Sequence, residues 1–170
     1  DMRGLKRDLW EGGHRIPFIV RYPGVVPAEI VSNELICQTD LMATIASLIG
    51  ISIPENAGED SFNMSKVFKG QQSDRPVRDY LIHHAPNGGF AIRKDNWVLI
   101  EATSGEVSKE PDWIKQKFNY QTDKTPMVLY DLKMGKEIKN LHAENPEKVT
   151  ELKSLLDKTR KDGRSAPVYR

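Results

Sequence analysis

The sequence has little net charge, no long hydrophobic run and a single cysteine. Its 170 residues carry 25 Lys and Arg against 24 Asp and Glu, a net charge of +1. This balance argues against binding to nucleic acid or to a membrane surface through bulk charge. No apolar run approaches the roughly 20 residues that span a bilayer, so we expect no membrane-spanning segment. Because Cys37 is alone, an intrachain disulfide is excluded.

Signatures of metal and nucleotide sites are missing as well. Beside Cys37 the chain has only four scattered histidines, too few convergent ligands for a zinc site. The acidic clusters lack the alternating oxygen ligands of a calcium loop. The Gly12-Gly13 pair does not belong to a GxxxxGK[ST] phosphate loop. We therefore predict no metal ion in this chain, and we expect Cys37 to be a packed residue with no catalytic base beside it.

The remaining composition is that of a globular protein. Hydrophobic residues make up 38% and charged residues 29% of the chain, enough for one domain with a small appendix. The opening "DMRGLKRDLW" has neither an initiator Met nor the apolar core of a signal peptide. We therefore expect the chain to start within a longer protein.

The first part of the chain, residues 1–76, has the pattern of an α/β layer. "IPFIVRYPG" predicts a strand over Phe18–Tyr22 that is buried on both faces. "TDLMATIASLIG" predicts a helix that Thr39 caps and Gly50 ends. Its expected buried stripe consists of Leu41, Ile45, Leu48 and Ile49. A strand followed by a helix is typical of the last piece of an α/β sheet.

The second part, residues 77–170, has a different pattern. "RDYLIHH", "GGFAIRK" and "NWVLIE" are short, partly alternating runs that predict an antiparallel meander, and "MVLYDL" adds a strand. A short helix is expected around Trp113–Phe118, and "NPEKVTELKSLLDKTRKDG" predicts the longest helix. The predicted fold class is therefore α/β, with α+β character in this chain: a small antiparallel sheet packed with a C-terminal helix.

Three histidines are candidates for contact with a polar substrate. His83 and His84 lie in a predicted strand, so their side chains point to opposite faces and cannot both bind one ion. Neutral imidazole both donates and accepts hydrogen bonds, which suits a substrate-facing role for at least one of them. His14 lies in the opening stretch, beside a Gly-Gly step.

The opening stretch "RGLKRDLWEGGHRIP", residues 3–17, supports two interpretations. In the structural one, Glu11 and Arg15 form an ion pair that fastens a loop while Trp10 packs beneath it. In the functional one, Lys6 or Arg15 contacts a bound oxyanion, and the glycines permit close approach of the backbone. The stretch alone leaves both open.

Together with its context, this stretch resembles the C-terminal part of the arylsulfatase family, within the alkaline-phosphatase-like superfamily. The matching segments cover nearly the whole chain in the order of the family. They are "RGLKRDLWEGGHRIPFIVRYPG", "ELICQTDLMATIASLIGISIP", "HHAPNGGFAIRKDNWVLI", "EPDWIKQKFNY" and "LYDLKMGKEIKNL".

The resemblance implies a sulfuric ester hydrolase with a formylglycine nucleophile and a calcium ion. It also implies that the Lys of a K-x-x-x-[WY]-E-G-G stretch, here Lys6, contacts the sulfate group. The expected partner is a sulfated small molecule or glycan, and the expected location is the periplasm or the outside of the cell. The substrate-facing candidates are His14, His83 and His84, and the structural loop candidates are Glu11, Gly12, Gly13 and Arg15.

This chain departs from the family pattern in two places. Cys37 is followed by Gln-Thr-Asp-Leu rather than by the C/S-x-P/A-x-R pattern, so it is not the formylglycine site. The nucleophile and the calcium ligands are therefore expected upstream of residue 1, and the isolated chain is expected to be inactive. "LYDLKMGKEIKNL" lacks the frequent DPxE turn, which predicts a reshaped loop.

Two consequences and two alternatives remain. A strand at 18–22 without its neighbours is an unpaired edge, so we expect self-association there. Substrate selectivity is expected on the variable segments 54–76 and 103–126. A phosphodiesterase or phosphonate hydrolase of the same superfamily is one alternative, because phosphoryl transfer needs similar anion clamps. A non-catalytic module that binds sulfated glycans is the other.

Overall fold

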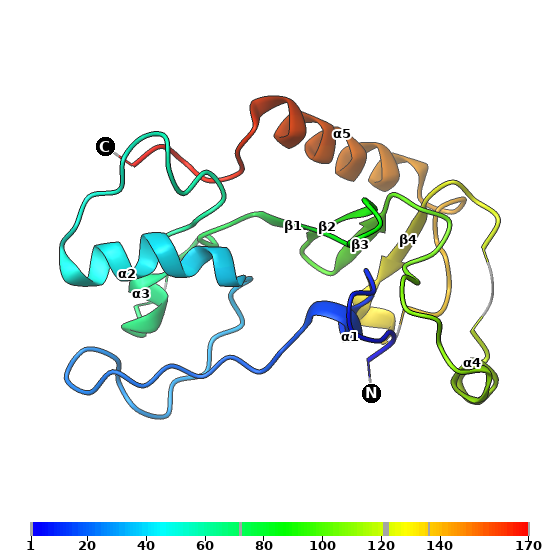
Figure 1. Cartoon of the computed structure of the whole chain (residues 1–170), viewed down its shortest axis with the longest axis horizontal. Coiled ribbons are helices and arrows are strands. Elements are labelled where there is room, and N and C mark those ends of the chain that lie inside the picture. Colours follow the sequence, from blue (N-terminus) through cyan, green and yellow to red (C-terminus); the bar gives the residue numbers. More distant parts are fainter. Residues whose placement is uncertain (1, 72, 121–122, 136, 170) are drawn as a thin grey trace. The chain divides into compact units, whose positions relative to one another are not determined.

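The computed structural model describes residues 2–71, 73–120, 123–135 and 137–169 (Figure 1). Among these residues, no helix combines the length and the apolar character that crossing a bilayer requires. The elements are, in order, α1 (Glu11–His14), η1 (Gln38–Asp40), α2 (Leu41–Ile49), α3 (Ser65–Phe68), β1 (Tyr80–His84), β2 (Phe90–Lys94), β3 (Trp97–Ile100), α4 (Asp112–Phe118), β4 (Val128–Asp131), η2 (Leu132–Met134) and α5 (Pro146–Asp162).

The chain forms two compact units, each assembled from two separated stretches. The first unit comprises Asp1–Pro17 and Ile82–Asp157, and the second comprises Phe18–Leu81 and Lys158–Arg170. The opening stretch therefore belongs with the sheet, although more than 60 residues separate them in sequence. The expected division of the enzyme into domains 1–76 and 77–170 stays a prediction.

The first unit is built on a four-stranded sheet with the order β1-β2-β3-β4, and its β2–β3 and β3–β4 pairs are antiparallel. The predicted meander is confirmed. Asp95 takes a left-handed conformation with φ 55° in the turn between β2 and β3, and Asp is one of the few residues that tolerate it.

Both faces of this sheet are covered. Because paired residues share a face, Ala91, Ile100 and Val128 lie on one side, where the buried Leu9 and Trp10 of the opening stretch join the same core cluster. Ile92, Leu99 and Leu129 lie on the other side and are 0% exposed.

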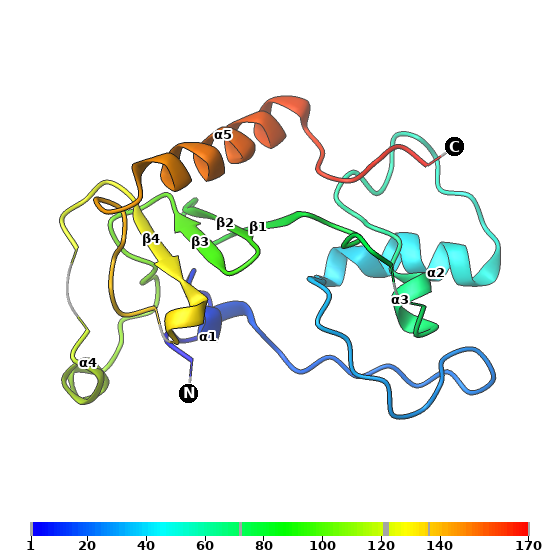
Figure 2. The same ribbon diagram turned by 180° about the vertical axis from the view of Figure 1, so that it is seen from behind.

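The part of α5 within the first unit runs along the sheet (Figure 2). Leu152 and Leu156 are 0% exposed, and Lys94 of β2 forms a 2.5 Å ion pair with Glu151 of α5. The predicted C-terminal helix and its pairing with the sheet are confirmed. The short helix expected at 113–118 is confirmed as α4.

The second unit corrects one expectation about strands. Residues 18–22 form no strand in the structure, so the strand predicted there is wrong. A strand exists only through hydrogen bonds to a partner, and no described segment pairs with these residues. Phe18, Ile19 and Tyr22 are 42%, 90% and 45% exposed. The apolar run that predicted burial on both faces is thus uncovered.

Helix α2 corrects a second expectation. The predicted helix is present and ends at Gly50, whose φ of 72° is left-handed. Its predicted buried stripe is wrong, because Ile45 and Ile49 are 51% and 58% exposed while Ala43 and Thr44 are buried. Polar contacts decide which side packs: Ser61 Oγ accepts from the Ala43 amide, and Thr44 Oγ1 accepts from the Met64 amide.

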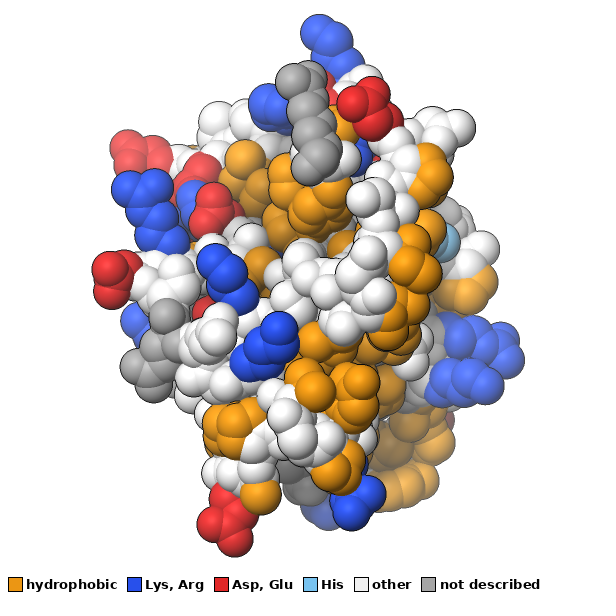
Figure 3. Space-filling view, turned by 90° about the vertical axis from the view of Figure 1, so that its left-hand side faces the viewer, with side chains coloured by type: hydrophobic (Ala, Val, Ile, Leu, Met, Phe, Trp, Pro, Cys, Tyr) orange, Lys and Arg blue, Asp and Glu red, His pale blue; other side chains and the backbone are white. Residues whose placement is uncertain are grey.

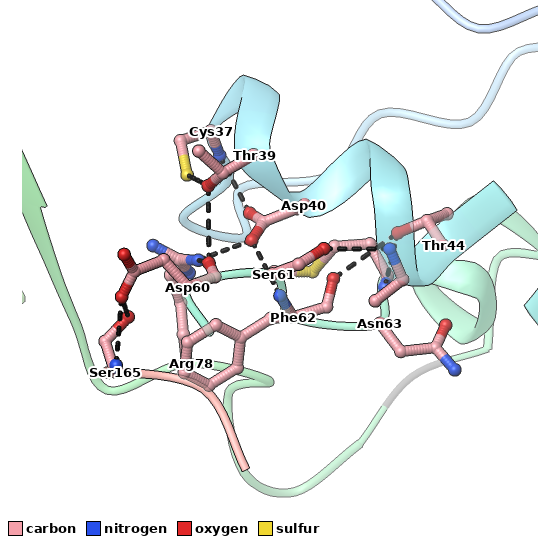
Figure 4. Close-up of polar contacts among 12 residues, drawn as sticks. Cys37, Thr39, Asp40, Thr44, Asp60, Ser61, Phe62, Asn63, Arg78 and Ser165 are labelled. Atoms are coloured by element: carbon pink, nitrogen blue, oxygen red, sulfur yellow. Dashed lines mark hydrogen bonds and ion pairs between the residues drawn. The ribbon is translucent and has the colours of Figure 1, made fainter. Parts of the chain in front are cut away.

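Asp40, rather than Thr39, organises the start of α2 (Figure 4). Its fully buried carboxylate accepts hydrogen bonds from the Cys37 and Phe62 amides, each at 2.9 Å, and pairs with the buried guanidinium of Arg78. Thr39 instead donates its hydroxyl to the Asp60 carbonyl. One buried ion pair therefore joins the start of α2 to the loop after residue 60 and to the approach to β1.

The second unit also exposes many large hydrophobic residues. Met42, Ile45 and Ile49 lie three and four residues apart, so they form an outward stripe on α2. Figure 3 shows hydrophobic side chains spread over this side of the molecule. The exposed members in the described part of this unit are Phe18, Ile19, Tyr22, Ile30, Val31, Met42, Ile45, Ile49, Ile51 and Val168.

Candidate functional site

Residues 3–13, which we call the Lys6 loop, form a closed loop at one face of the sheet. The Gly12 amide donates to the Arg3 carbonyl at 2.7 Å and closes the base of the loop. A Cβ on Gly12 would lie 2.5 Å from the Gly4 carbonyl oxygen, and one on Gly13 would lie 2.1 Å from that of Asp8. The two glycines are therefore required by steric contact, because real Cβ atoms do not approach so closely.

Asp8 fixes the tip of the Lys6 loop. Its buried carboxylate accepts from the Leu5 amide on one oxygen and from the Val107 and Ser108 amides on the other, each at 2.7 Å. Ser108 Oγ also donates to the Lys6 carbonyl at 2.6 Å. The backbone of Lys6 is thus held against the segment that follows β3.

The side chain of Lys6 is exposed, and within the described parts of the chain it has no hydrogen-bond or ion-pair partner. Arg7 beside it is also exposed and takes a left-handed φ of 84°. The loop therefore presents a cation on a well-defined backbone without engaging its ammonium group. An ammonium so placed is available to an anion.

A stack of aromatic and guanidinium groups supports the loop from below. The Arg3 guanidinium carbon lies 3.8 Å from the centre of the Trp10 ring and 4.1 Å from that of Tyr120. Trp10 is 1% exposed, and a Cβ on Gly105 would lie 2.7 Å from its Nε1. The Leu9 amide donates to the Gly105 carbonyl at 2.8 Å. Trp10 is thus packed too tightly to contact a ligand.

Glu11 forms ion pairs with two arginines, one in the opening stretch and one in the sheet. Its carboxylate forms ion pairs with Arg15 at 2.9 Å and with Arg93 of β2 at 3.3 Å. The ion pair of the structural interpretation is therefore present. Of the two cations considered for an oxyanion, Arg15 is engaged by Glu11, whereas Lys6 is not engaged by any described side chain.

Glu137 lies beneath the start of α1 and is 2% exposed. Its Oε2 accepts a 3.0 Å hydrogen bond from the Glu11 amide, and its main-chain carbonyl accepts from Arg3 Nη1 at 2.5 Å. Its Oε1 is buried without a partner among the described residues. Burial, with the Glu11 carboxylate nearby, raises the pKa of Glu137 to about 8.

The three candidate histidines separate into two environments. The rings of His14 and His83 lie 3.8 Å apart between centres, and His83 Nε2 lies 3.2 Å from the Leu9 carbonyl. Burial, followed by the charge of His14, lowers the pKa of His83 to about 4, and burial also lowers the pKa of His14. His84 is exposed beside Phe90, at 5.6 Å between rings. His84 is therefore the accessible member of the set.

The structure brings most of the predicted site residues together around one loop and adds four that sequence reasoning missed. Asp8 had a usable local signal, because an Asp three residues after Leu5 can accept its amide in a turn. Glu137 had none, since 126 residues separate it from Glu11. The missed residues are Arg3, Asp8, Arg93 and Glu137. Of the two segments expected to set selectivity, 103–126 contacts the Lys6 loop through Gly105, Val107 and Ser108.

The described residues do not fit a calcium ion or a formylglycine. No group of three or more His, Cys, Asp or Glu side chains among them is arranged to hold a metal ion. Cys37 is partly buried with its Sγ 2.8 Å from Thr39 Oγ1, within the sequence Cys-Gln-Thr-Asp-Leu. Neither group can therefore be assigned to these residues.

Comparisons with known proteins agree over nearly the whole chain. Residues 5–162 match the family model described as N-sulphoglucosamine sulphohydrolase, C-terminal. An N-acetylgalactosamine-6-O-sulfatase of Bacteroides thetaiotaomicron is 34% identical over 156 residues, which cover 91% of this chain and 29% of that protein. Arylsulfatase G of Rattus norvegicus is 38% identical over 109 residues, which cover 59% of this chain and 20% of that protein.

Solved structures give the same result for the fold. A structure from work on the metabolism of multiple glycosaminoglycans by Bacteroides thetaiotaomicron has a TM-score of 0.76 and 31% identity, covering 94% of this chain and 32% of that one. The crystal structure of Ps i-CgsB has a TM-score of 0.62 at 22% identity, covering 89% of this chain and 30% of that one. The predicted fold class is confirmed. The matched part is 29% of the N-acetylgalactosamine-6-O-sulfatase, 20% of the rat arylsulfatase G and 32% of the chain in the Bacteroides structure, so this chain spans only part of its relatives.

Proposed function

Since this chain belongs to the sulfatase family and matches its C-terminal region, we propose that it takes part in hydrolysis of sulfate esters to free sulfate and an alcohol. In this proposal Lys6 contacts the sulfate group. The chain spans only 29% of its Bacteroides relative, and the proposal assigns the nucleophile, the calcium ion and its ligands to residues outside this chain. The isolated chain is then inactive.

The observation that carries the proposal is the unpartnered ammonium of Lys6 on a closed loop. Lys6 stands at the first position of K-x-x-x-W-E-G-G, and both Gly12 and Gly13 are sterically required. Negative charge develops on the leaving oxygen of a sulfate ester while the sulfonyl oxygens stay charge-rich. A fixed ammonium stabilises that distribution, and Lys suits the role as a compact charge with rotatable donors.

Sulfated glycans are the proposed substrate class. The name of the Bacteroides relative specifies a 6-O-sulfated N-acetylgalactosamine, and the structure with a TM-score of 0.76 comes from work on glycosaminoglycans. His84 is the exposed candidate among the three histidines, and it points to the opposite side of β1 from His83, whose ring contacts the Lys6 loop. In this proposal it would contact a part of the glycan other than the sulfate group. His14, the last residue of α1, and His83 of β1 act indirectly, by packing against each other. For this substrate class, the proposed location of the enzyme is the periplasm or the outside of the cell.

The experiment measures turnover by the full-length enzyme on sulfated sugars. Lys6→Ala is expected to lower turnover by about 10²- to 10³-fold, as the loss of a charge-stabilising group does. Lys133→Ala removes an exposed cation from the 3₁₀ turn η2 and is the matched control, with expected activity near wild type. Near-normal turnover by Lys6→Ala would overturn the assignment of the sulfate contact.

A parallel assay compares ester classes. Sulfate monoesters, phosphate diesters and phosphonates are offered to the same full-length enzyme. A preference for sulfate esters supports the proposal, and a preference for phosphorus esters favours a phosphodiesterase or phosphonate hydrolase. Binding of sulfated sugars with no turnover of any ester would favour a glycan-binding module instead.

A further inference from the structure

Glu137 contacts both ends of the closed Lys6 loop. The base of the loop is the 2.7 Å hydrogen bond from the Gly12 amide to the Arg3 carbonyl. The main-chain carbonyl of Glu137 accepts a hydrogen bond from the Arg3 side chain on one side of that closure. Its side-chain Oε2 accepts one from the Glu11 amide on the other side. No other described residue outside the opening stretch is recorded as a hydrogen-bond partner of both ends.

We propose that Glu137 is a positioning residue: its buried carboxyl group fastens the base of the Lys6 loop and thereby sets where the Lys6 ammonium is presented. This inference depends on the proposed sulfatase function only where it assigns Lys6 a contact with the sulfate group. The fastening itself is a property of the loop.

The connection from Glu137 to Lys6 is short and stiff. The Glu11 amide is at the first residue of α1, a four-residue helix whose first amides have no partner within the helix. Glu137 Oε2 caps that amide, and the next two residues are glycines whose Cβ positions are filled by backbone. Between the base and Lys6, Asp8 holds the tip. Loss of the Glu137 hydrogen bond at the base therefore displaces the tip that carries Lys6. A displacement of a catalytic group by about 1 Å lowers the reaction rate strongly.

The surroundings of Glu137 favour an uncharged carboxyl group. Burial and the Glu11 carboxylate raise the pKa of Glu137 to about 8, although Arg3 and Arg93 oppose the shift. At neutral pH the group is therefore mostly protonated, and Oε2 still accepts the Glu11 amide. Above pH 8 it ionises, and its negative charge then repels the Glu11 carboxylate. Among the residues that the structure describes, the titratable and charged groups that face Glu137 are Arg3, Glu11, Arg93, Tyr120 and Tyr130.

Two variants of the full-length enzyme separate positioning from bulk stability. Glu137→Gln keeps an oxygen acceptor for the Glu11 amide and removes ionisation, whereas Glu137→Ala removes the acceptor. Glu144→Ala is the matched control, because it removes a 55% exposed carboxylate from the same stretch, where it pairs with Lys139.

Amide hydrogen exchange tests the fastening without any activity. Glu137→Ala is expected to raise exchange at Glu11 and Gly12 by about 10-fold or more, beyond any change at the sheet amides of β3. Glu137→Gln and Glu144→Ala are expected to keep wild-type exchange there. Unchanged exchange at Glu11 and Gly12 in Glu137→Ala would overturn the proposal, and so would a uniform rise across the chain.

Kinetics test the consequence for Lys6. Glu137→Ala is expected to lower kcat by about 10-fold or more with a smaller change in KM, while Glu137→Gln, which keeps the acceptor oxygen, is expected to keep kcat. In a Lys6→Ala background, Glu137→Ala is expected to change kcat by less than about twofold, because both changes act through one ammonium. Independent, multiplicative losses would overturn the proposal. Normal turnover by Lys6→Ala would instead overturn the sulfate contact and leave the exchange result standing.

Discussion

His14 and His83 lie with their ring centres 3.8 Å apart and their planes at 34°, so that imidazoles from the two separate stretches of the first unit form one partly buried contact. Two protonated rings at that distance would repel each other without water between them. Burial accordingly lowers the pKa of both groups, that of His83 to about 4.

The first prediction concerns stability in acid. Since the folded-state pKa of His83 is about 4 and its ordinary value is 6.5, the unfolded chain binds more protons between these values. Stability is therefore complete above pH 6.5 and is lost as the pH falls toward 4, by at most about 3 kcal/mol from this group. Urea denaturation of the chain at pH 7.0 and pH 5.0 measures the loss.

The matched pair for this measurement is His83→Gln and His84→Gln. His83→Gln removes the buried titrating group and is expected to flatten the decline between pH 7.0 and pH 5.0. His84 is exposed, so His84→Gln is expected to keep the wild-type pH dependence. An equal decline in both variants would show that other groups cause the acid loss.

The second prediction concerns the two glycines of the Lys6 loop. Gly13→Ala places a Cβ 2.1 Å from the Asp8 carbonyl oxygen, and Gly12→Ala places one 2.5 Å from that of Gly4. Since both neighbours are backbone atoms, relief requires a backbone shift, and we expect each change to cost about 2 kcal/mol or more. Gly24→Ala meets no atom within 4 Å and suffers only its left-handed φ of 83°, a cost of about 1 kcal/mol. Chemical denaturation ranks the three, and a smaller loss in Gly12→Ala than in Gly24→Ala would contradict the packing.

The third prediction concerns the buried ion pair of Asp40 and Arg78. Arg78→Ala leaves the fully buried Asp40 carboxylate without its cation, and we expect a loss of about 3–5 kcal/mol. Lys158→Ala breaks an exposed i,i+4 pair with Asp162 and is the control, with an expected loss much smaller than that of Arg78→Ala. Thermal melting of both variants gives the comparison, and similar midpoints would contradict the structural role of the pair.

The sequence correctly predicted the elements whose formation depends on residues close to one another along the chain. The strands of the meander, the turn at Asp95 and the end of α2 at Gly50 each follow from local conformational preference and alternation. The side of α2 that packs could not be predicted in the same way. Apolar spacing identifies Ile45 and Ile49 as a stripe. The hydroxyls of Ser61 and Thr44, which accept hydrogen bonds from the Ala43 and Met64 amides, bring the opposite side against the chain.

The candidate site shows the same division. Lys6 and the two glycines stand within one short motif, whereas their support comes from distant stretches. Arg93 lies on β2, and Glu137 lies in the loop after η2. The missing DPxE turn predicted that this loop is reshaped, but it gave no role to Glu137. Contacts across 82 and 126 residues depend on the completed fold, so spacing in the sequence carries no sign of them.

The fourth prediction concerns the exposed hydrophobic residues of the second unit. Met42, Ile45 and Ile49 on α2, together with the unpaired segment 18–22, are typical of a surface that another polypeptide segment covers. The isolated chain is therefore expected to self-associate, with a mass in light scattering that rises with concentration. Ile45→Lys with Ile49→Lys is expected to suppress that rise, because burying two ammonium groups is costly. Trp113→Lys changes an equally exposed residue of the first unit, which is 64% exposed, and is expected to leave the rise unchanged. A chain that stays monomeric at high concentration would contradict association through this surface.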